Sequence, residues 1–459
     1  TLLLPRLKDA IHRLNPHLPD SAVQTAVNAM RDTVFAGDLI SENRRLHEAL
    51  VGGVKVTWFE NGEERSDLAR LVDWSNTQNE WLAVSQFEVA GKTLRRPDIV
   101  LFLNGLPIVV IELKGTENGT LKGAFNQIDT YKAQIPDLFR TNAFSVISEG
   151  VTARYGSVSA DYDRFMRWRT IDGDTVIEDT SALALQVLTQ GLLAPGNLLQ
   201  MIRWFSVFED EGKGPIKKIA GYHQFHAVRK GVDAVFAARG RDGRGGVMWH
   251  TQGSGKSLLM AFLGGRLMRD PDLANPTLVI ITDRNDLDNQ LFATFSRCAA
   301  LFGEKPEQAD GIDDLKRLLE RKVGGVIFAT IQKFRPGKGQ DDSGLLTDRN
   351  NVIVFADEAH RSQYGFEAKI DAETGETRYG FAHHLRVALP NAVHVGFTGT
   401  PVSLVSADTQ GVFGDYIDIY DVTRAVEDGA TVPIYYEGRV AKITTDQEIM
   451  DQIDTDFDV

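Results

Sequence analysis

The chain has 459 residues, of which 42% are hydrophobic and 25% charged, close to an average globular protein. This length favours several domains, and no apolar run approaches the ~18 residues that a membrane-spanning helix requires, so no membrane partner is expected. The formal net charge of −13 argues against a protein that coats nucleic acid, although it leaves room for a local basic groove. The single cysteine, Cys298, cannot form a disulfide within the chain, which fits a cytoplasmic protein. The first residues do not resemble a signal peptide. Because the sequence starts at Thr1 and not at a methionine, we expect a fragment of a longer chain.

Helical and strand patterns are mixed in the first part of the chain. Apolar residues recur at helical spacing between residues 22 and 30, which predicts helical structure within residues 21–50. Two apolar strands flank Asn104-Gly105, which predicts a β-hairpin over residues 97–114, and a helix is expected over 121–134. The polar, glycine-bearing segment 209–215 is the best linker candidate. We therefore expect a first domain over residues 1–208.

Beyond this segment, apolar runs of strand length alternate with helical stretches. The runs cover residues 246–249, 277–282, 325–330, 352–356 and 392–397. Such alternation is typical of a parallel sheet with crossover helices, so the fold class is α/β. We expect this domain over residues 209–403. Residues 404–459 are too few for a full α/β domain and are expected to begin another one.

The strongest local motif is Trp249-His-Thr-Gln-Gly-Ser-Gly-Lys-Ser257, which follows a short apolar strand and opens a helical pattern. This is the context of a P-loop, in which glycines let backbone N–H groups approach phosphates. Lys256 would reach the β- and γ-phosphates of ATP, and the Ser257 hydroxyl would bind Mg²⁺. One departure is His250, which occupies a position where glycine is usual. The alternative is a glycine-rich turn with an exposed lysine.

A pair of acids follows the apolar run 352–356. At the carboxyl end of a parallel strand, Asp357 can hold Mg²⁺ and Glu358 can polarise the attacking water. Alternatively, the two residues are solvated acids at a strand end. A P-loop and this acid pair on separate strands seldom coincide by chance, so we interpret the pair as a site of ATP hydrolysis.

A second group of charged residues lies on the expected hairpin. Glu112 and Lys114 are two residues apart and project from one face of a strand, where charges are rare without a function. A two-residue loop would turn Glu112 away from Asp98, whereas a three-residue loop would pair Leu103 with Pro107 and Asp98 with Glu112. We predict the three-residue loop. Two converging carboxylates and a lysine can hold Mg²⁺ and hydrolyse a phosphodiester, although a surface hairpin with an ion pair is the alternative.

The three residues match the PD-(D/E)xK pattern of nucleases. Further along the chain, Gln127 and Tyr131 share one helix face because they are four residues apart. This pair resembles the accessory motif of nucleases that are joined to DNA translocases, and would contact DNA or support the catalytic strand. It could equally be a core tyrosine beside a polar surface residue.

The second half resembles superfamily 2 helicase-like translocases, with Asp357-Glu-Ala-His360 and Thr398-Gly-Thr-Pro401 in the places of motifs II and III. The resemblance implies a RecA-like motor domain that binds ATP through Gln224, Thr251, Gly253, Ser254, Gly255, Lys256 and Ser257. It also implies that Arg284, Thr330, Lys333, His360, Thr398 and Thr400 couple hydrolysis to DNA. Alternatives remain for two motifs, since Gln224 could be an ordinary exposed glutamine and residues 282–288 a capped helix start.

A PD-(D/E)xK nuclease followed by such a motor resembles the R subunit of type I restriction enzymes. The resemblance implies a restriction-endonuclease-like domain that cuts duplex DNA non-specifically after ATP-driven translocation, with methyltransferase and specificity subunits as partners. A further acidic residue from an earlier helix is usual; Glu42 and Glu48 are possible acids, although a solvated helix face is favoured for both. The closing half of the ATP cleft is expected past Val459. The alternative functions are a nucleic-acid-dependent ATPase remodeller with an inactive nuclease fold, or a repair helicase-nuclease acting at DNA ends.

Overall fold

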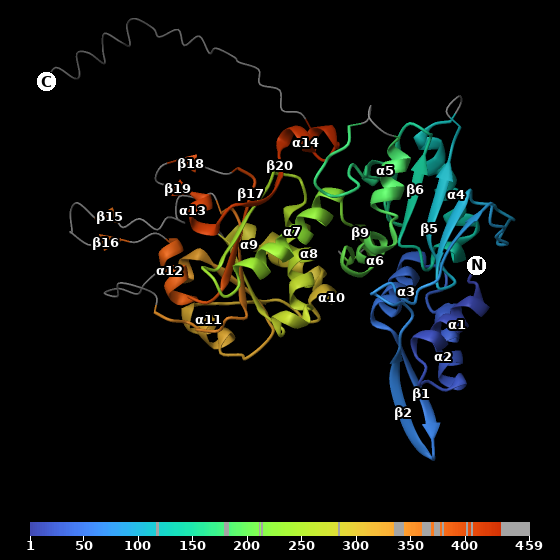
Figure 1. The fold of residues 1–459 in the computed structure, drawn as a ribbon, viewed down its shortest axis with the longest axis horizontal. Coiled ribbons are helices and arrows are strands. Elements are labelled where there is room, and N and C mark those ends of the chain that lie inside the picture. Colours follow the sequence, from blue (N-terminus) through green and yellow to red (C-terminus); the bar gives the residue numbers. More distant parts are fainter. Residues whose placement is uncertain are drawn as a thin grey trace, which may run out of the picture.

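The computed structural model describes residues 1–115, 119–178, 183–210, 212, 214–282, 285–334, 344–359, 369–370, 377–378, 381–400, 403–404 and 407–432. These residues form two lobes, one around a five-stranded sheet and one around a seven-stranded sheet (Figure 1). Within the described part of the chain, no helix is both long and apolar enough to cross a membrane.

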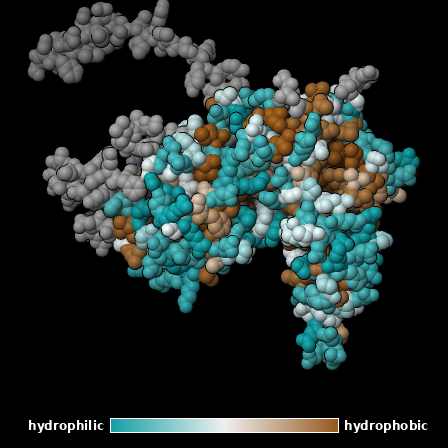
Figure 2. Space-filling view, viewed as in Figure 1, coloured by the Kyte–Doolittle hydropathy of each residue, from teal (hydrophilic) through white to brown (hydrophobic). Residues whose placement is uncertain are grey.

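Three helices begin the first lobe: α1 (Leu4–Leu14), α2 (Asp20–Arg31) and α3 (Leu39–Gly52). The helical structure expected within residues 21–50 is therefore divided in two. Asp38 starts the second part, because its Oδ1 accepts hydrogen bonds from the backbone N–H groups of Ile40 and Ser41. The hairpin of β1 (Val54–Glu60) and β2 (Glu63–Ala69) projects from the lobe (Figure 1), and its surface is mostly hydrophilic in Figure 2.

The sheet of the first lobe has the order β3-β4-β5-β6-β7. Its strands are β3 (Trp81–Ser85), β4 (Ile99–Leu103), β5 (Leu106–Leu113), β6 (Phe144–Ser148) and β7 (Ala153–Gly156). Only β5 and β6 are parallel, and α4 (Leu121–Gln134) connects them, followed by η1 (Pro136–Phe139). The predicted hairpin and the predicted helix over 121–134 are confirmed. One apolar face of α4 packs on the sheet, through Phe125, Ile128 and neighbours.

The turn between β4 and β5 differs from the one predicted. Leu103 pairs with Leu106, so the pairing of Leu103 with Pro107 is wrong and the loop holds only two residues. These are Asn104 and Gly105, with φ values of 51° and 80°, as a type I′ turn requires.

A β-bulge corrects the register after this turn. Ile108 is an extra residue on β5, and beyond it Ile99 pairs with Ile111. Continuing this register by one residue places Asp98 opposite Glu112. The two acids are thus neighbours across the hairpin, as predicted, but through a bulge and not through a longer loop.

The segment between the two sheets contains η2 (Tyr162–Arg164), α5 (Ala184–Gly191), α6 (Pro195–Trp204), β8 (Ser206–Asp210) and β9 (Pro215–Ile219). Since β8 and β9 pair as an antiparallel hairpin, the expected linker at 209–215 is instead the tip of that hairpin. The hairpin is anchored on the first lobe by Lys217, whose buried Nζ lies 3.1 Å from Asn43 Oδ1 and 2.8 Å from the Asn142 carbonyl oxygen.

The predicted parallel sheet is confirmed, with the order β12-β13-β11-β14-β17-β10-β20 and every neighbouring pair parallel. The strands are β10 (Arg244–His250), β11 (Thr277–Thr282), β12 (Glu307–Gln308), β13 (Val326–Thr330), β14 (Val352–Ala356), β17 (Val393–Thr398) and β20 (Tyr416–Tyr420). One face packs against α7 (Tyr222–Ala238), α8 (Lys256–Met268), α9 (Asn285–Arg297) and α10 (Ala299–Phe302). The other face packs against α11 (Ile312–Leu319), α12 (Phe381–Ala388) and α13 (Thr409–Phe413).

Short elements complete the second lobe: η3 (Pro271–Leu273), η4 (Ile331–Phe334), α14 (Val422–Glu427) and the two-residue strands β15 (Lys369–Ile370), β16 (Thr377–Arg378), β18 (Ser403–Leu404) and β19 (Ala407–Asp408). Strand β20 lies beyond residue 403, where the first motor domain was expected to end. Because β20 pairs with β10, residues 416–420 complete this sheet and do not begin another one. Residues 433–459 lie outside the described part.

Candidate active sites

The three residues of the predicted nuclease site meet at the carboxyl end of β5. Lys114 Nζ lies 2.6 Å from Glu112 Oε1, which makes an ion pair on one face of the strand. Asp98, just before β4, reaches the same strand end, where its Oδ2 accepts a hydrogen bond of 2.8 Å from the Leu113 N–H. The geometry therefore brings together the residue types that the PD-(D/E)xK pattern requires.

The accessory pair on α4 contacts this site. The Tyr131 hydroxyl donates to Glu112 Oε2 over 3.2 Å. Burial and the negative charge of Glu112 raise the pKa of Tyr131, and the nearby Gln127 side chain acts in the opposite direction. Gln86, which sequence reasoning missed, donates from Nε2 to Asp98 Oδ1 over 2.9 Å. A lone glutamine after a short strand carries no pattern that would have revealed this role. Both carboxylates are thus oriented by neutral donors, as a preorganised site requires.

Burial and a neighbouring acid act on Glu112. Glu112 is only 3% exposed. Burial raises the pKa of Glu112 and the negative charge of Asp98 raises it further, against the hydrogen bonds from Lys114 and Tyr131. The charged form of Glu112 is therefore disfavoured in the protein alone, and a bound cation would favour it.

The oxygen ligands at this point suit Mg²⁺. Asp98 and Glu112 supply hard carboxylate oxygens, each with lone pairs beyond those used by its present donors. The described residues contain no group of three or more His, Cys, Asp or Glu side chains that could enclose a metal ion. Two carboxylates without a third leave coordination positions for a phosphate oxygen and water.

The two other acids considered for this site are used elsewhere. Glu42 is buried and its oxygens accept hydrogen bonds from Arg45 and Arg140, so the expected solvated helix face is wrong for this residue. Glu48 is half-exposed and pairs with Arg44 over 2.9 Å, as a surface residue of α3. Neither contacts the nuclease residues in the described contacts.

The P-loop follows β10 and leads into α8. Gly253 and Gly255 both have φ of 85°, a left-handed conformation that glycine adopts without strain. The N–H of Thr251 donates to the carbonyl of Tyr420, which ties the loop to β20. Within the described residues, the buried Ser254 Oγ has no hydrogen-bond partner. A phosphate oxygen in the loop would supply one.

Lys256 points toward the segment after β17. A Cβ atom added to Gly399 would lie 3.1 Å from Lys256 Nζ, so the ammonium lies beside Thr398 and Thr400. The backbone N–H of Thr400 donates to Thr398 Oγ1 over 3.1 Å, which shapes this turn. Ser257 follows Lys256 in the first turn of α8. Because Trp249 of β10 pairs with Thr398 of β17, the P-loop and the segment after β17 both lie at the carboxyl edge of the sheet.

The acid pair lies at the same edge, directly after β14. The N–H of Asp357 donates to the Ile281 carbonyl, and Asp357 Oδ1 accepts from the N–H of Glu358 over 3.0 Å. Glu358 has a φ of 49°, a left-handed backbone conformation that is uncommon for residues with a side chain and that clusters at active sites. In the strand order β14-β17-β10, one strand separates the acid pair from the P-loop at the same carboxyl edge of the sheet, where ligands of parallel sheets bind.

Gln224 lies against the P-loop and is only 6% exposed, so the alternative of an ordinary exposed glutamine is wrong. Its Nε2 donates to the Gly255 carbonyl over 3.1 Å, and its Oε1 accepts from the Gly221 N–H over 3.0 Å. The amide keeps one further proton and one further lone pair, so a contact to adenine stays a prediction.

A cluster of side chains that the sequence did not reveal packs against the P-loop. Its members are His223, His250, Asp418 and Tyr420. His250 is buried and its Nε2 lies 2.9 Å from Asp418 Oδ2, which explains a histidine where glycine is usual. His223 stacks on Tyr420 with ring centroids 4.0 Å apart, and its Nε2 is 3.1 Å from the Ser254 carbonyl oxygen. Burial lowers the pKa of His223 to about 4, with a further contribution from His250, so His223 is neutral at pH 7.

The residues expected to face DNA are only partly described. Thr330 ends β13 and is buried, and Lys333 in η4 donates to the carbonyl oxygen of Ala309. Arg284 and His360 lie outside the described residues.

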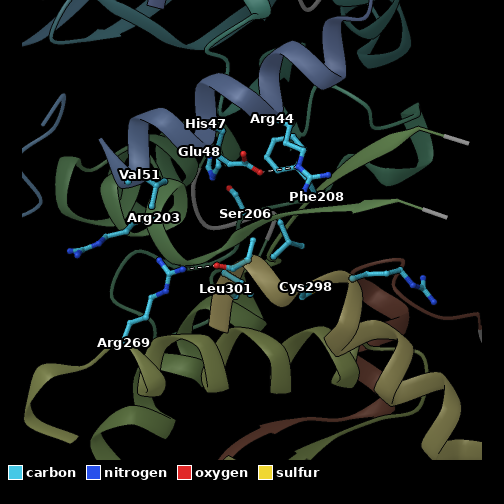
Figure 3. Close-up of a pocket in the computed structure, with 14 residues that line it drawn as sticks. Arg44, His47, Glu48, Val51, Arg203, Ser206, Phe208, Arg269, Cys298 and Leu301 are labelled. Atoms are coloured by element: carbon cyan, nitrogen blue, oxygen red, sulfur yellow. Dashed lines mark hydrogen bonds and ion pairs between the residues drawn. The ribbon is translucent and has the colours of Figure 1, made fainter. Parts of the chain in front are cut away.

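A separate cavity of about 240 Å³ lies between α3 of the first lobe and the α8–α10 region of the second (Figure 3). Arg44, Arg203, Arg269 and Cys298 are among its lining residues. Figure 3 shows Arg44 and Arg203 extending to opposite sides, and Arg269 donates to the Ala300 carbonyl. Glu48, one of the two acids considered for the nuclease site, also lines this cavity, whereas the described residues of the predicted nuclease and ATP sites do not.

Two family models match the chain. The SWI2/SNF2 ATPase model matches residues 223–459, over half of the chain, and includes the P-loop and the acid pair. The chain belongs to the SWI2/SNF2 ATPase family. The model for the N terminus of the type I restriction enzyme R protein matches residues 1–164 of this family member, which include Asp98, Glu112 and Lys114.

Curated relatives align with nearly the whole of this chain. The chain is 47% identical to the type I restriction enzyme HindI endonuclease subunit of Haemophilus influenzae, over 95% of this chain and 42% of the relative. It is 35% identical to the putative type I restriction enzyme MjaIXP endonuclease subunit of Methanocaldococcus jannaschii, over 100% of this chain and 44% of the relative. The predicted resemblance to R subunits is therefore confirmed, and the chain spans less than half the length of these relatives. A solved fragment of a putative HsdR subunit from Vibrio vulnificus is 17% identical with a TM-score of 0.30, over 77% of this chain and 57% of that one.

Proposed function

We propose that this chain carries the nuclease and the first motor domain of a type I restriction enzyme R subunit, a type I site-specific deoxyribonuclease. The protein would translocate duplex DNA with ATP and cut it non-specifically, away from the recognition site. One observation carries the proposal: Asp98, Glu112 and Lys114 gather at the carboxyl end of one strand, and a P-loop and an acid pair lie at the carboxyl edge of a second, parallel sheet.

In the nuclease site, Asp98 and Glu112 would hold Mg²⁺, which supplies Lewis-acid chemistry at the scissile phosphate when bound. Lys114 lies on the same strand face, where its ammonium can stabilise the charge that develops on the phosphate. Tyr131 fixes the orientation of Glu112 through its hydrogen bond of 3.2 Å. Gln127, four residues before Tyr131 on α4, would be a positioning residue for Tyr131.

In the nucleotide site, the P-loop backbone and Lys256 would bind the phosphates of ATP. Ser257 and Asp357 supply the oxygens that would hold its Mg²⁺, which neutralises phosphate charge when bound. Glu358 would orient the attacking water, and Thr398 and Thr400, beside Lys256, would sense the γ-phosphate. Domains 1–208 and 209–403 are proposed as the nuclease and motor units, with the motor sheet extended to β20.

Duplex DNA is the proposed substrate, with the methyltransferase and specificity subunits of a type I complex as partners. The names of the relatives support these partners, because they are endonuclease subunits of type I restriction enzymes. The proposed compartment is the cytoplasm, where such a complex would meet incoming DNA.

A nucleic-acid-dependent ATPase with an inactive nuclease fold is the second candidate. It is favoured by the hydrogen bonds in the nuclease site, since all four carboxylate oxygens of Asp98 and Glu112 accept one. The two candidates differ in whether the carboxylates exchange these donors for a metal.

Mg²⁺-dependent nicking of plasmid DNA by the complete enzyme separates the candidates. Lys114→Ala is expected to lower the cleavage rate at least about 100-fold, the scale of a lost electrostatic stabiliser. Lys132→Ala is the matched control, because Lys132 lies on α4 and pairs with Asp129 on the helix surface. Equal cleavage by both variants would favour the inactive nuclease fold. Separately, Lys256→Ala is expected to abolish ATP turnover, and persistent turnover would refute the P-loop assignment.

A further inference from the structure

A buried arginine links the first lobe to the end of the second. Met166 pairs with Tyr155 of β7 as an isolated β-bridge, and three residues later Arg169 reaches toward α14. The Arg169 side chain is 5% exposed, and its Nη1 lies 2.9 Å from Asp428 Oδ1. Glu178 and Glu427 also contact its guanidinium, but their side chains are 67% and 49% exposed. Asp428 is therefore the buried partner of this arginine.

Asp428 also holds two tyrosines. Its Oδ2 accepts a hydrogen bond of 2.8 Å from the Tyr222 hydroxyl and one of 2.7 Å from the Tyr420 hydroxyl. With Arg169 on the other oxygen, the carboxylate has three charge-assisted hydrogen bonds, and its side chain is only 8% exposed. All three partners meet at the Asp428 carboxylate, which fixes the relative positions of Arg169, Tyr222 and Tyr420, while the buried Arg169 Nε has no hydrogen-bond partner within the described residues.

Both tyrosines belong to segments that contact the P-loop. The backbone carbonyl of Tyr420 accepts from the Thr251 N–H, and its ring stacks on His223, which contacts the Ser254 carbonyl. Tyr222 opens α7, whose first turn also carries Gln224 against Gly255. A displaced Asp428 would therefore move both sides of the loop that is proposed to hold the phosphates.

We propose that the Arg169–Asp428 ion pair is a positioning element for ATP. Through the two tyrosines it sets the P-loop and the first turn of α7, and through Arg169 it joins them to the sheet edge of the first lobe. Neither residue contacts the nucleotide in this proposal, which rests on the proposed function of the P-loop as an ATP site. Occupancy of that site is then coupled to the segment that follows β7.

The test is the dissociation constant of ATP, measured by calorimetry on the full-length protein, together with KM and kcat for ATP turnover. Asp428→Asn is expected to weaken ATP binding about tenfold and to raise KM with kcat changed less than about twofold, because it disturbs ground-state binding. Glu427→Gln is the matched control, since it removes one charge next to Arg169 at an exposed position. Equal affinities of the two variants would overturn the proposal.

Single hydroxyls provide a milder probe that preserves the fold. Tyr222→Phe and Tyr420→Phe are each expected to weaken ATP binding a few fold in the wild-type background and to have no further effect in the Asp428→Asn background. Additive effects would overturn the shared role of Asp428. A wild-type protein that fails to bind ATP would instead refute the proposed function of the P-loop.

The link to the first lobe has its own readout. The Ile177 N–H donates to the Arg169 carbonyl over 2.8 Å, so its hydrogen exchange reports on the position of Arg169. ATP is expected to slow this exchange in the wild type and not in Asp428→Asn. Exchange that ATP leaves unchanged in the wild type would overturn the coupling.

Discussion

Replacing Glu42 with glutamine is expected to destabilise the first lobe by about 3 kcal/mol at neutral pH. Burial disfavours the charge of Glu42, but hydrogen bonds from Arg45, Arg140 and the N–H groups of Val34 and Phe35 outweigh it and lower the pKa from 4.5 to about 2. At 1.36 kcal/mol per tenfold change in acidity, this lowering corresponds to about 3 kcal/mol of folding stability. Glutamine keeps the shape of the side chain and removes the charge that the two arginines contact.

The pH dependence follows from the direction of this change. Because the folded protein holds the lower pKa, the stabilisation is complete above pH 4.5 and is lost as the pH falls toward 2. The difference in stability between wild type and Glu42→Gln should therefore shrink across this interval.

Urea unfolding followed by tryptophan fluorescence measures this difference, since five of the six tryptophans precede residue 209. The control is Glu48→Gln on the same helix, where a half-exposed pair with Arg44 should contribute less than about 1 kcal/mol. If Glu42→Gln unfolds like the control, or if its deficit is the same at pH 7 and pH 3, the reasoning about this network is refuted.

Two further predictions concern the sites. Tyr131→Phe removes a hydrogen bond that stabilises the Glu112 carboxylate, so the pKa of Glu112 should rise further. The acid limb of the pH profile of DNA cleavage should then move to higher pH, and an unmoved limb would contradict this prediction. Gly255→Ala would place a Cβ atom 2.7 Å from Gln224 Nε2, at a φ of 85° that alanine adopts only with strain. The affinity for ATP, measured by calorimetry, should fall at least about tenfold. Wild-type affinity would show that the loop is not held as described.

The elements set by local sequence were the ones predicted well. The helix over 121–134 was found at its predicted bounds because Thr120 caps it, accepting from the Gly123 N–H, and its apolar residues share one face. The strands 277–282 and 352–356 were also correct, since continuous apolar runs are typical of parallel strands buried on both faces.

The errors arose where tertiary contacts decide. The bulge at Ile108 is invisible in an apolar run, so the register of Asp98 and Glu112 was reached by the wrong turn. The burial of Glu42 depends on Arg140, 98 residues away along the chain. The boundary expected at residue 403 took no account of β20, which returns to pair with β10.

The same limit applies to the sites. Spacing within one strand or one loop identified Glu112 with Lys114 and the P-loop residues. It could not identify Gln86, Asp418 or Asp428, whose partners lie on other elements. Residues that bear recognisable patterns could therefore be proposed from the sequence, whereas the residues that contact them were seen only in the structure.

The central claim is that one chain performs two separate reactions on phosphate groups. Its most direct test is plasmid cleavage and ATP turnover measured in the same sample of complete enzyme with Asp98→Ala. We predict that this variant hydrolyses ATP at the wild-type rate and leaves the plasmid uncut. Cleavage at the wild-type rate would contradict the account, because a nuclease that does not need Asp98 would have its active site elsewhere.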